Sequence, residues 1–113
     1  MIHKKHVSEP YFTFIKKGIK TIEGRLNKGS FTDICIGDTV IWFTSNSAEQ
    51  VKTKIVKINK YDSFYKYLKK EKLKHTLPNV KNIEDGVAIY YKFYTHVDEH
   101  KYGVLAIHIK LFD

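Results

Sequence analysis

The densest group of residues able to do chemistry lies between Gly18 and Arg25. Here a predicted helix ends at a glycine and a predicted strand begins, on which alternation places Thr21, Glu23 and Arg25 on one face. The long side chain of Lys20, at the start of the strand, can turn back to join them. A hydroxyl, a carboxylate and two cations can hold a phosphate, hydrogen-bond a base edge, or pair an acid with a base for proton transfer. A structural ion pair on a solvated face is the alternative.

Basic residues outnumber acidic ones, with 20 Lys and Arg against 12 Asp and Glu and a net charge of +8. This excess favours a nucleic-acid partner, because phosphates reward clustered cations through counterion release. A solvated lysine-rich surface is the alternative. Only one of the basic residues is an arginine, and it stands at position 25. Because a guanidinium offers a planar fork of donors that lysine cannot copy, we predict a special role for Arg25.

Length and composition indicate a single domain over residues 1–113. The hydrophobic fraction of 42% and the aromatic fraction of 14% exclude a disordered chain. No apolar run approaches the roughly 18 residues of a membrane span, and Met1–His6 lacks the apolar stretch of a secretion signal. The single Cys35 cannot form an internal disulfide and, between two isoleucines, is expected to be buried. We therefore expect an intracellular protein, cytoplasmic or nuclear, that is not secreted.

Five segments have the composition or alternation of strands. The segment Thr39–Phe43 is almost entirely apolar and is expected to be buried on both faces or close to it. The segment Val51–Ile58 alternates and has one face richer in lysine. The complete set of expected strands is His3–Val7, Lys20–Leu26, Thr39–Phe43, Val51–Ile58 and Val104–Phe112.

Helical patterns occupy the rest of the chain. The expected helices run from Ser8 to Gly18, from Asp62 through Lys70 and over Ile83–Tyr94, and Leu73 to Leu77 is expected to be a short helix or a turn before Pro78. The segment His96–Tyr102 is predicted to be a charged loop. Strands outnumber helices and do not alternate with them as βαβ units. We therefore predict an α+β fold, a small barrel with helices packed on its rim.

Three motifs, in order, resemble the ASCH domain family. They are G-x-K-T-x-E-x-R over Gly18–Arg25, I-G-D-T-V-I-W-F over Ile36–Phe43, and Y-G-V-L-A-I over Tyr102–Ile107. The helices expected after Tyr61 fall where the family places its inserted helices. ASCH domains are relatives of the PUA RNA-binding domain. The resemblance implies a PUA-like β-barrel with a cleft beside the helices, and RNA or nucleotide binding.

Some members of that family are amidohydrolases that remove an acyl group from the exocyclic amine of modified cytidine, using a Lys, a Thr nucleophile and a Glu. Lys20 matches the lysine, and Glu84 stands roughly where the family's Glu falls. The nucleophile position, three residues after the lysine, holds Glu23, and the nearby Thr21 is not the matching position. A carboxylate replaces an activated hydroxyl poorly in acyl transfer. Other relatives are described as ribonucleases. If this chain acted in the same way, Glu23 would be the base, and Lys20 and Arg25 would stabilise the charge of the phosphorane.

Metal and cofactor sites are not indicated. The pairs His3 with His6 and His96 with His100 have helical spacing but no cysteine partners, so we expect no metal ion. No phosphate-binding loop or dinucleotide fingerprint occurs, so we expect no cofactor. Tyrosines interleave with lysines in the second half of the chain, and bases stack on such rings. Tyrosines at helical spacing mostly cover a core, however, and Trp42 is expected to be in the core.

Three functional hypotheses follow. The first is a module that binds RNA or a nucleotide, in which Lys20, Thr21 and Arg25 contact the ligand and Glu23 discriminates by accepting from an exocyclic amine. The second is an enzyme on nucleic-acid substrates, a ribonuclease or an amidohydrolase, with Lys20, Glu23 and Glu84 as the catalytic set. The third is a protein-interaction module whose lysines meet an acidic partner. We expect no membrane association, and a monomer or weak dimer.

Overall fold

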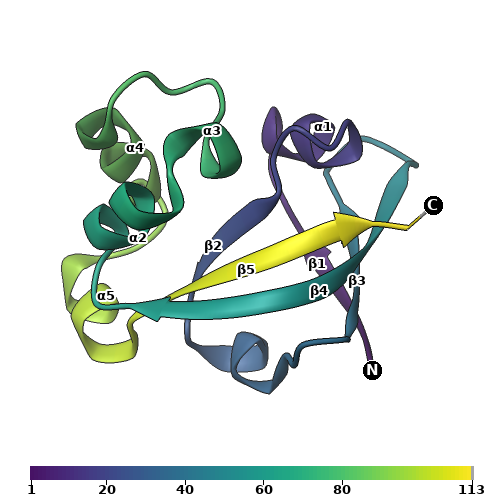
Figure 1. The fold of residues 1–113 in the computed structure, drawn as a ribbon, viewed down its shortest axis with the longest axis horizontal. Helices are drawn as coiled ribbons and strands as arrows, with labels where there is room; N and C mark the ends of the chain where they lie inside the picture. The colour runs from purple at the N-terminus through teal and green to yellow at the C-terminus, as the bar shows by residue number, and fades with distance from the viewer. Residues whose placement is uncertain (113) are drawn as a thin grey trace.

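The computed structural model describes residues 1–112, which form a curled five-stranded sheet with helices packed around it (Figure 1). The strands, in sheet order, are β1 (Ile2–His6), β3 (Thr39–Phe43), β4 (Gln50–Tyr61), β5 (Val104–Leu111) and β2 (Ile22–Leu26). β1 pairs with β3 in parallel, and the other pairs are antiparallel. The expected α+β fold, with a strongly curved sheet and helices on its rim, is confirmed.

The helices divide into two groups. α1 (Tyr11–Lys16) lies at one end of the sheet, and a 3₁₀ turn (Gly29–Asp33) follows β2. The other helices gather at the opposite end, as Figure 1 shows, and they are α2 (Phe64–Glu71), α3 (Leu73–Thr76), α4 (Ile83–Tyr90) and α5 (His96–Tyr102). Within residues 1–112, none of these helices has the length and apolar character needed to cross a bilayer.

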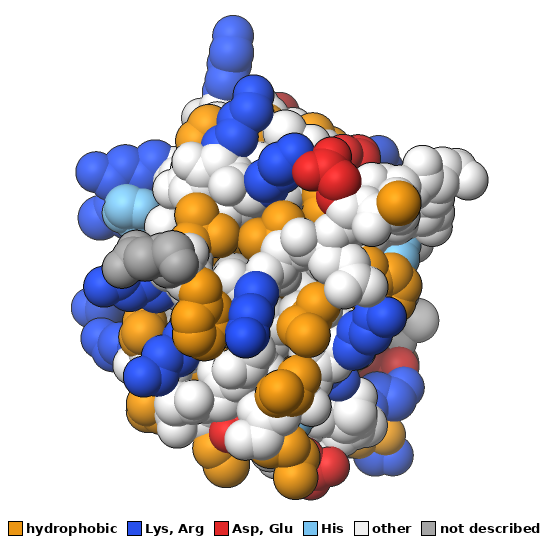
Figure 2. Space-filling view, turned by 90° about the vertical axis from the view of Figure 1, so that its right-hand side faces the viewer, with side chains coloured by type: hydrophobic (Ala, Val, Ile, Leu, Met, Phe, Trp, Pro, Cys, Tyr) orange, Lys and Arg blue, Asp and Glu red, His pale blue; other side chains and the backbone are white. Residues whose placement is uncertain are grey.

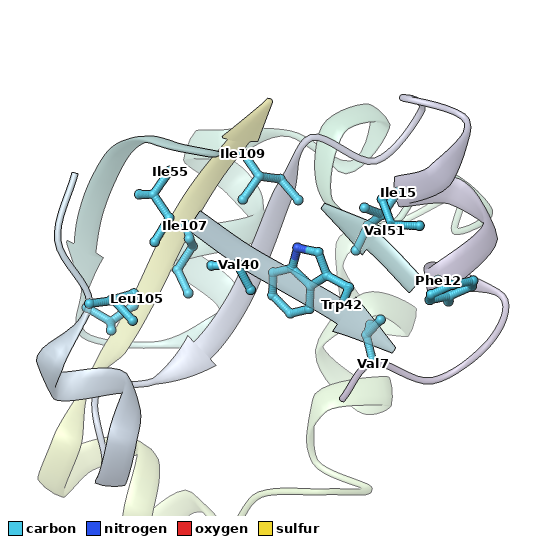
Figure 3. Close-up of a cluster of buried hydrophobic side chains, with 11 residues drawn as sticks. Val7, Phe12, Ile15, Val40, Trp42, Val51, Ile55, Leu105, Ile107 and Ile109 are labelled. Atoms are coloured by element: carbon cyan, nitrogen blue, oxygen red, sulfur yellow. The ribbon is translucent and has the colours of Figure 1, made fainter. Parts of the chain in front are cut away.

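The concave side of the sheet encloses the main hydrophobic core (Figure 3). Trp42 is fully buried there, as expected, and its indole Nε1 donates to Thr53 Oγ1 at 2.8 Å. Thr39–Phe43 was expected to be buried on both faces or close to it, and burial alternates along β3, so that Val40 and Trp42 on one face are fully enclosed. The other face of β3 carries half-buried side chains. This sheet therefore has an inner face in the core and an outer face that is partly open to solvent.

A second core fills the space between the helices at the far end and the convex side of β2 and β5. Two buried carboxylates attach helices across this space. Glu71 of α2 accepts from Tyr61 Oη at 2.6 Å and from Asn59 Nδ2 at 2.8 Å, both on β4. Glu99 of α5 accepts from the Phe64 amide at 2.8 Å and from Tyr91 Oη at 2.6 Å. The Glu71 bonds thus attach α2 to β4, and the Glu99 bonds attach α5 to the start of α2 and to the turn after α4.

Three expectations about local structure were wrong. The charged segment His96–Tyr102 is helix α5, since Thr95 caps it by accepting from the Asp98 amide at 3.1 Å. The helix beginning at Ile83 ends at Tyr90 and continues as a turn rather than reaching Tyr94. Cys35 is exposed, because its backbone N–H donates to Asp38 Oδ2 in a surface turn and its neighbour Ile34 is buried instead.

Candidate functional site

The strand that carries the candidate residues, β2, lies at one edge of the sheet and pairs with β5. Glu23 stands opposite Ile107 and Arg25 opposite Leu105, so both face the inner side of the sheet. Gly24, between them, faces the helices, where a Cβ would lie 2.5 Å from Cζ of the Tyr67 ring. The glycine in this strand therefore permits close packing of Tyr67 against the backbone, which holds β2 in place.

Lys20 is buried with 1% of its surface exposed, and its ammonium group has three acceptors within the protein. Nζ donates to the Ile22 carbonyl at 2.8 Å and to the Thr76 carbonyl, and it lies 3.2 Å from Glu23 Oε1. Burial lowers the pKa of Lys20, and attraction to Glu23 opposes this shift. An ammonium group has three N–H donors, so these acceptors use all of them.

Glu23 lies between two cations. Its Oε1 faces Lys20, and its Oε2 accepts from Arg25 Nε at 2.9 Å and lies 2.9 Å from Arg25 Nη2. Burial opposes ionisation of this carboxyl group, but the charges of Lys20 and Arg25 outweigh burial and lower its pKa. Glu23 is thus an ionised acceptor that positions the guanidinium.

Arg25 connects the two edges of the curled sheet. Its Nη2 donates to the His6 carbonyl at the end of β1, while β1 and β2 are the outermost strands of the sheet order. We call the line along which these two strands approach each other the seam. The guanidinium carbon lies 5.0 Å from the Phe31 ring centroid and 5.8 Å from that of Trp42. The side chain of Arg25 remains 18% exposed, so the guanidinium reaches the surface at the seam.

Two half-buried tyrosines adjoin this ionic network. Burial raises the pKa of Tyr94, and the charges of Arg25 and Glu23 act on it in opposite directions. The ring of Tyr11 has its centroid 5.5 Å from Lys20 Nζ, and its pKa is raised by burial and by the nearby charge of Glu23. Both phenol groups therefore lie within electrostatic range of Glu23.

A hollow of about 280 Å³ opens beside Lys20 and Thr21, between α1 and the end of β5. Its walls are mostly aliphatic, from Ile15, Ile109 and Leu111, with Thr53 and Lys110 as further polar residues. Its volume is just below the roughly 300–1,000 Å³ of typical small-molecule sites.

The structure brings together Lys20, Glu23 and Arg25, as their spacing predicted, and places Thr21 beside the first of them. Glu84 is an exposed residue in the first turn of α4 and is not among the groups that contact Lys20 or Glu23. Sequence reasoning missed the carbonyl oxygens of His6 and Thr76. No sequence signal marks them, because the contacts depend on backbone atoms brought from other elements.

A curled five-stranded sheet with helices inserted before the last strand is the arrangement that the resemblance to the ASCH family led us to expect. A profile of the ASCH domain family matches residues 6–112. The chain therefore belongs to the ASCH domain family, which is in general associated with RNA binding.

Two solved structures are similar to this chain over nearly its whole length. The crystal structure of the hypothetical protein PH0355 superposes with a TM-score of 0.90 at 39% sequence identity, covering 99% of this chain and 100% of that one. The solution structure of protein PF0455 from Pyrococcus furiosus has a TM-score of 0.82 at 35% identity, covering 100% of this chain and 99% of that one. Among curated proteins, none matches this chain.

Proposed function

We propose that the protein is an RNA- or nucleotide-binding module that holds its ligand at the seam, in the basic region next to the segment from Gly18 to Arg25. The supporting observation is the orientation of Arg25. Its Nε and Nη2 are held by Glu23 and the His6 carbonyl, and no group of residues 1–112 accepts from Nη1, whose N–H groups are therefore left for a ligand. A guanidinium fixed in this way loses little conformational freedom when it binds a phosphate or a base edge.

The other residues of the network have supporting roles in this proposal. Lys20 has its three donors bound within the protein, so it acts on a ligand through its charge and by positioning Glu23. Thr21 lines the hollow beside Lys20, where its hydroxyl can contact a small group of the ligand. The half-buried ring of Tyr94 stacks on Phe64 at a centroid distance of 5.4 Å, so only its other face is a candidate surface for a stacked base.

RNA is favoured over duplex DNA, because RNA-binding proteins mostly recognise unpaired bases and the shape of the RNA. A short seam with one arginine and nearby rings can accommodate an unpaired base. The net charge of +8 supplies a field that attracts any polyanion. We therefore expect affinity that falls steeply with salt.

The geometry argues against the enzyme hypothesis in its simplest forms. A general base must accept a proton, yet both oxygens of Glu23 already face cations and its pKa is lowered. The amidohydrolase version also needs the Glu84 carboxylate near Lys20, whereas Glu84 lies in an exposed helix turn. Catalysis by this set remains a prediction that turnover assays with RNA and with acylated cytidine would test.

The experiment is fluorescence anisotropy with a labelled twelve-nucleotide oligouridylate, comparing wild type with Arg25→Lys. The substitution keeps the charge but removes the planar fork, so we expect affinity to fall at least about fivefold. Lys28→Arg, at an exposed position, is the matched control and is expected to bind as wild type does. Circular dichroism checks that each variant is folded.

A measurement on the unaltered protein makes the test independent of folding. In ¹⁵N-labelled wild type, the Arg25 Nε–H resonance is expected to shift on addition of the oligonucleotide. Unchanged affinity in the folded Arg25→Lys variant, or an unshifted Nε–H resonance at saturating oligonucleotide, would overturn the proposal.

A further inference from the structure

The outer face of the sheet carries a group of lysines and two phenylalanines that the seam does not use. Residues paired across neighbouring strands lie on the same face, so Lys4 and Lys52 flank Ile41 of β3, and Lys54 lies opposite Lys110. We define the outer face by Lys4, Lys52, Lys54, Lys110, Phe43 and Phe112. Figure 2 views the side of the molecule with β3 and the C-terminal end of β5, and shows lysine and hydrophobic side chains interleaved there.

The charges on this face all have the same sign. Within residues 1–112, no Asp or Glu occupies an outward position on β1, β3, the first half of β4 or the end of β5. Lys54 and Lys110 are directly opposed, an arrangement that destabilises a sheet. Lysines often protect edge strands from pairing, but β4 is an interior strand, so edge protection does not account for Lys52 and Lys54.

Aromatic rings lie under two of these lysines. Lys52 Nζ is 4.9 Å from the ring centroid of Phe112, and Lys4 Nζ is 5.6 Å from that of Phe43. Phe112 is 47% exposed, while Phe43 is half-buried. Where an ammonium group lies beside an accessible ring, the ammonium can bind a phosphate of the ligand and the ring can stack on the adjacent base.

The spacing of the lysines is regular. Side chains two residues apart on a strand project about 7 Å apart, and neighbouring strands are separated by about 4.8 Å. Lys52 and Lys54 lie two residues apart on β4, and Lys54 faces Lys110 on the neighbouring strand β5. The result is a short array of cations over the sheet, with the Phe112 ring beside one of them.

We propose that the outer face is a second contact surface for single-stranded nucleic acid. Lys52, Lys54 and Lys110 neutralise consecutive phosphates, and Phe112 stacks on a base. The inference goes beyond the proposed function, since it does not need Arg25, and of its residues only Lys110 also lines the hollow beside Lys20. Single strands are favoured over duplexes because only unpaired bases offer a face to the Phe112 ring.

The test compares two triple variants that each remove three positive charges. Lys52, Lys54 and Lys110 are changed to Gln in one, and the exposed Lys69, Lys70 and Lys74 of α2 and α3 are changed to Gln in the other. Binding of the twelve-nucleotide oligouridylate is measured between about 50 mM and 300 mM salt. In the variant of Lys52, Lys54 and Lys110, the loss of three phosphate contacts is expected to lower the slope of log affinity against log salt by about 2. The control variant is expected to change this slope far less.

A single-residue variant tests the ring. Phe112→Ala is expected to weaken binding at least about fivefold with the salt slope unchanged, since it removes stacking and no charge. Equal losses from the two triple variants would overturn the inference, because net charge alone would explain them. An unaffected Phe112→Ala variant would also overturn it, as would binding to an acidic protein or anionic vesicles with no measurable oligonucleotide affinity.

These measurements test the proposal for the seam and the proposal for the outer face separately. A normal Arg25→Lys variant with a weakened Lys52, Lys54 and Lys110 variant would refute the seam and support the outer face. The reverse pattern would refute the outer face and support the seam.

Discussion

Replacing Glu23 with Gln tests whether the ionic network is the structural centre of the site. The substitution keeps the shape of the side chain but removes the negative charge between Lys20 and Arg25. Arg25 is 18% exposed and can recover hydration, whereas Lys20, with 1% exposed, cannot. Breaking a buried pair by removing one partner costs about 3–5 kcal/mol, and we expect Glu23→Gln to lower the free energy of unfolding by that amount.

Lys20→Met is the matched change on the other side of the pair. It leaves Glu23 paired with Arg25, so no charge is left uncompensated, but the carbonyls of Ile22 and Thr76 lose their donor. Each unpaired buried acceptor costs about 1–3 kcal/mol. In the double variant, Lys20→Met has already removed the buried ammonium group. Glu23→Gln therefore leaves no buried cation without its negative partner. The double variant should therefore be more stable than the sum of the single effects by about 1–3 kcal/mol.

Urea unfolding at pH 7, followed by circular dichroism, measures these free energies, and an unchanged dependence on denaturant shows that the unfolded state is comparable. The acid range adds a second readout. The folded pKa of Glu23 is lowered, so its contribution is present above the unfolded value of about 4.3 and is lost as pH falls through the folded pKa. Glu23→Gln should lack this part of the acid dependence. Additivity of the two substitutions within about 0.5 kcal/mol would refute the reasoning.

Two further predictions concern the packing of Tyr67. Gly24→Ala should destabilise the protein by about 1–3 kcal/mol, because the new Cβ would meet a buried ring, whereas Gly86→Ala should cost less since it meets leucine methyl groups at 2.9 Å or more. Burial raises the pKa of both Tyr67 and Tyr90 well above 10, so stability is retained below pH 10 and falls above it as the unfolded chain ionises. Tyr67→Phe should reduce that alkaline slope by about 1.4 kcal/mol per pH unit.

Thermal and urea unfolding measure both effects. Equal costs for alanine at Gly24 and Gly86 would show that contact with Tyr67 is not what requires a glycine in β2. For the alkaline experiment, Tyr65→Phe, at an exposed tyrosine, is the control and should leave the slope unchanged. Parallel profiles for Tyr67→Phe and wild type between pH 10 and 11.5 would contradict the prediction for the buried phenol.

The core of the candidate site was predictable because it is local in sequence. Alternation along one strand places Glu23 and Arg25 on the same face, and Lys20 lies close enough for its long side chain to reach them. The rest depends on distant parts of the chain. The Thr76 carbonyl that binds Lys20 is 56 residues away, and the His6 carbonyl that binds Arg25 comes from the other edge of the sheet.

The errors in the predicted elements have a common physical origin. The predictions used the composition of each segment, whereas a few specific contacts determine its local structure. Helix α5 was hidden by its charges, although Thr95 followed by Asp98 is a capping signal, and its Glu99 is buried because two donors bind it. The apolar composition of Thr39–Phe43 suggested burial on both faces or close to it, but the side chains on the outer face of β3 are only half-buried. The outer face that this leaves open was predictable only as a lysine-rich face of one strand.

Strand β1 relates the two proposed surfaces, because its alternate residues face opposite sides of the sheet. Lys4 points outward, whereas Lys5 points inward over the Phe31 ring at 4.1 Å, with its pKa lowered by burial and then by Arg25. The His6 carbonyl at the end of the strand accepts from Arg25. At this edge of the sheet β1 approaches β2, and Arg25 of β2 lies against its end at the seam. Lys4 and Lys5 therefore place one cation of the same strand on each of the two proposed surfaces.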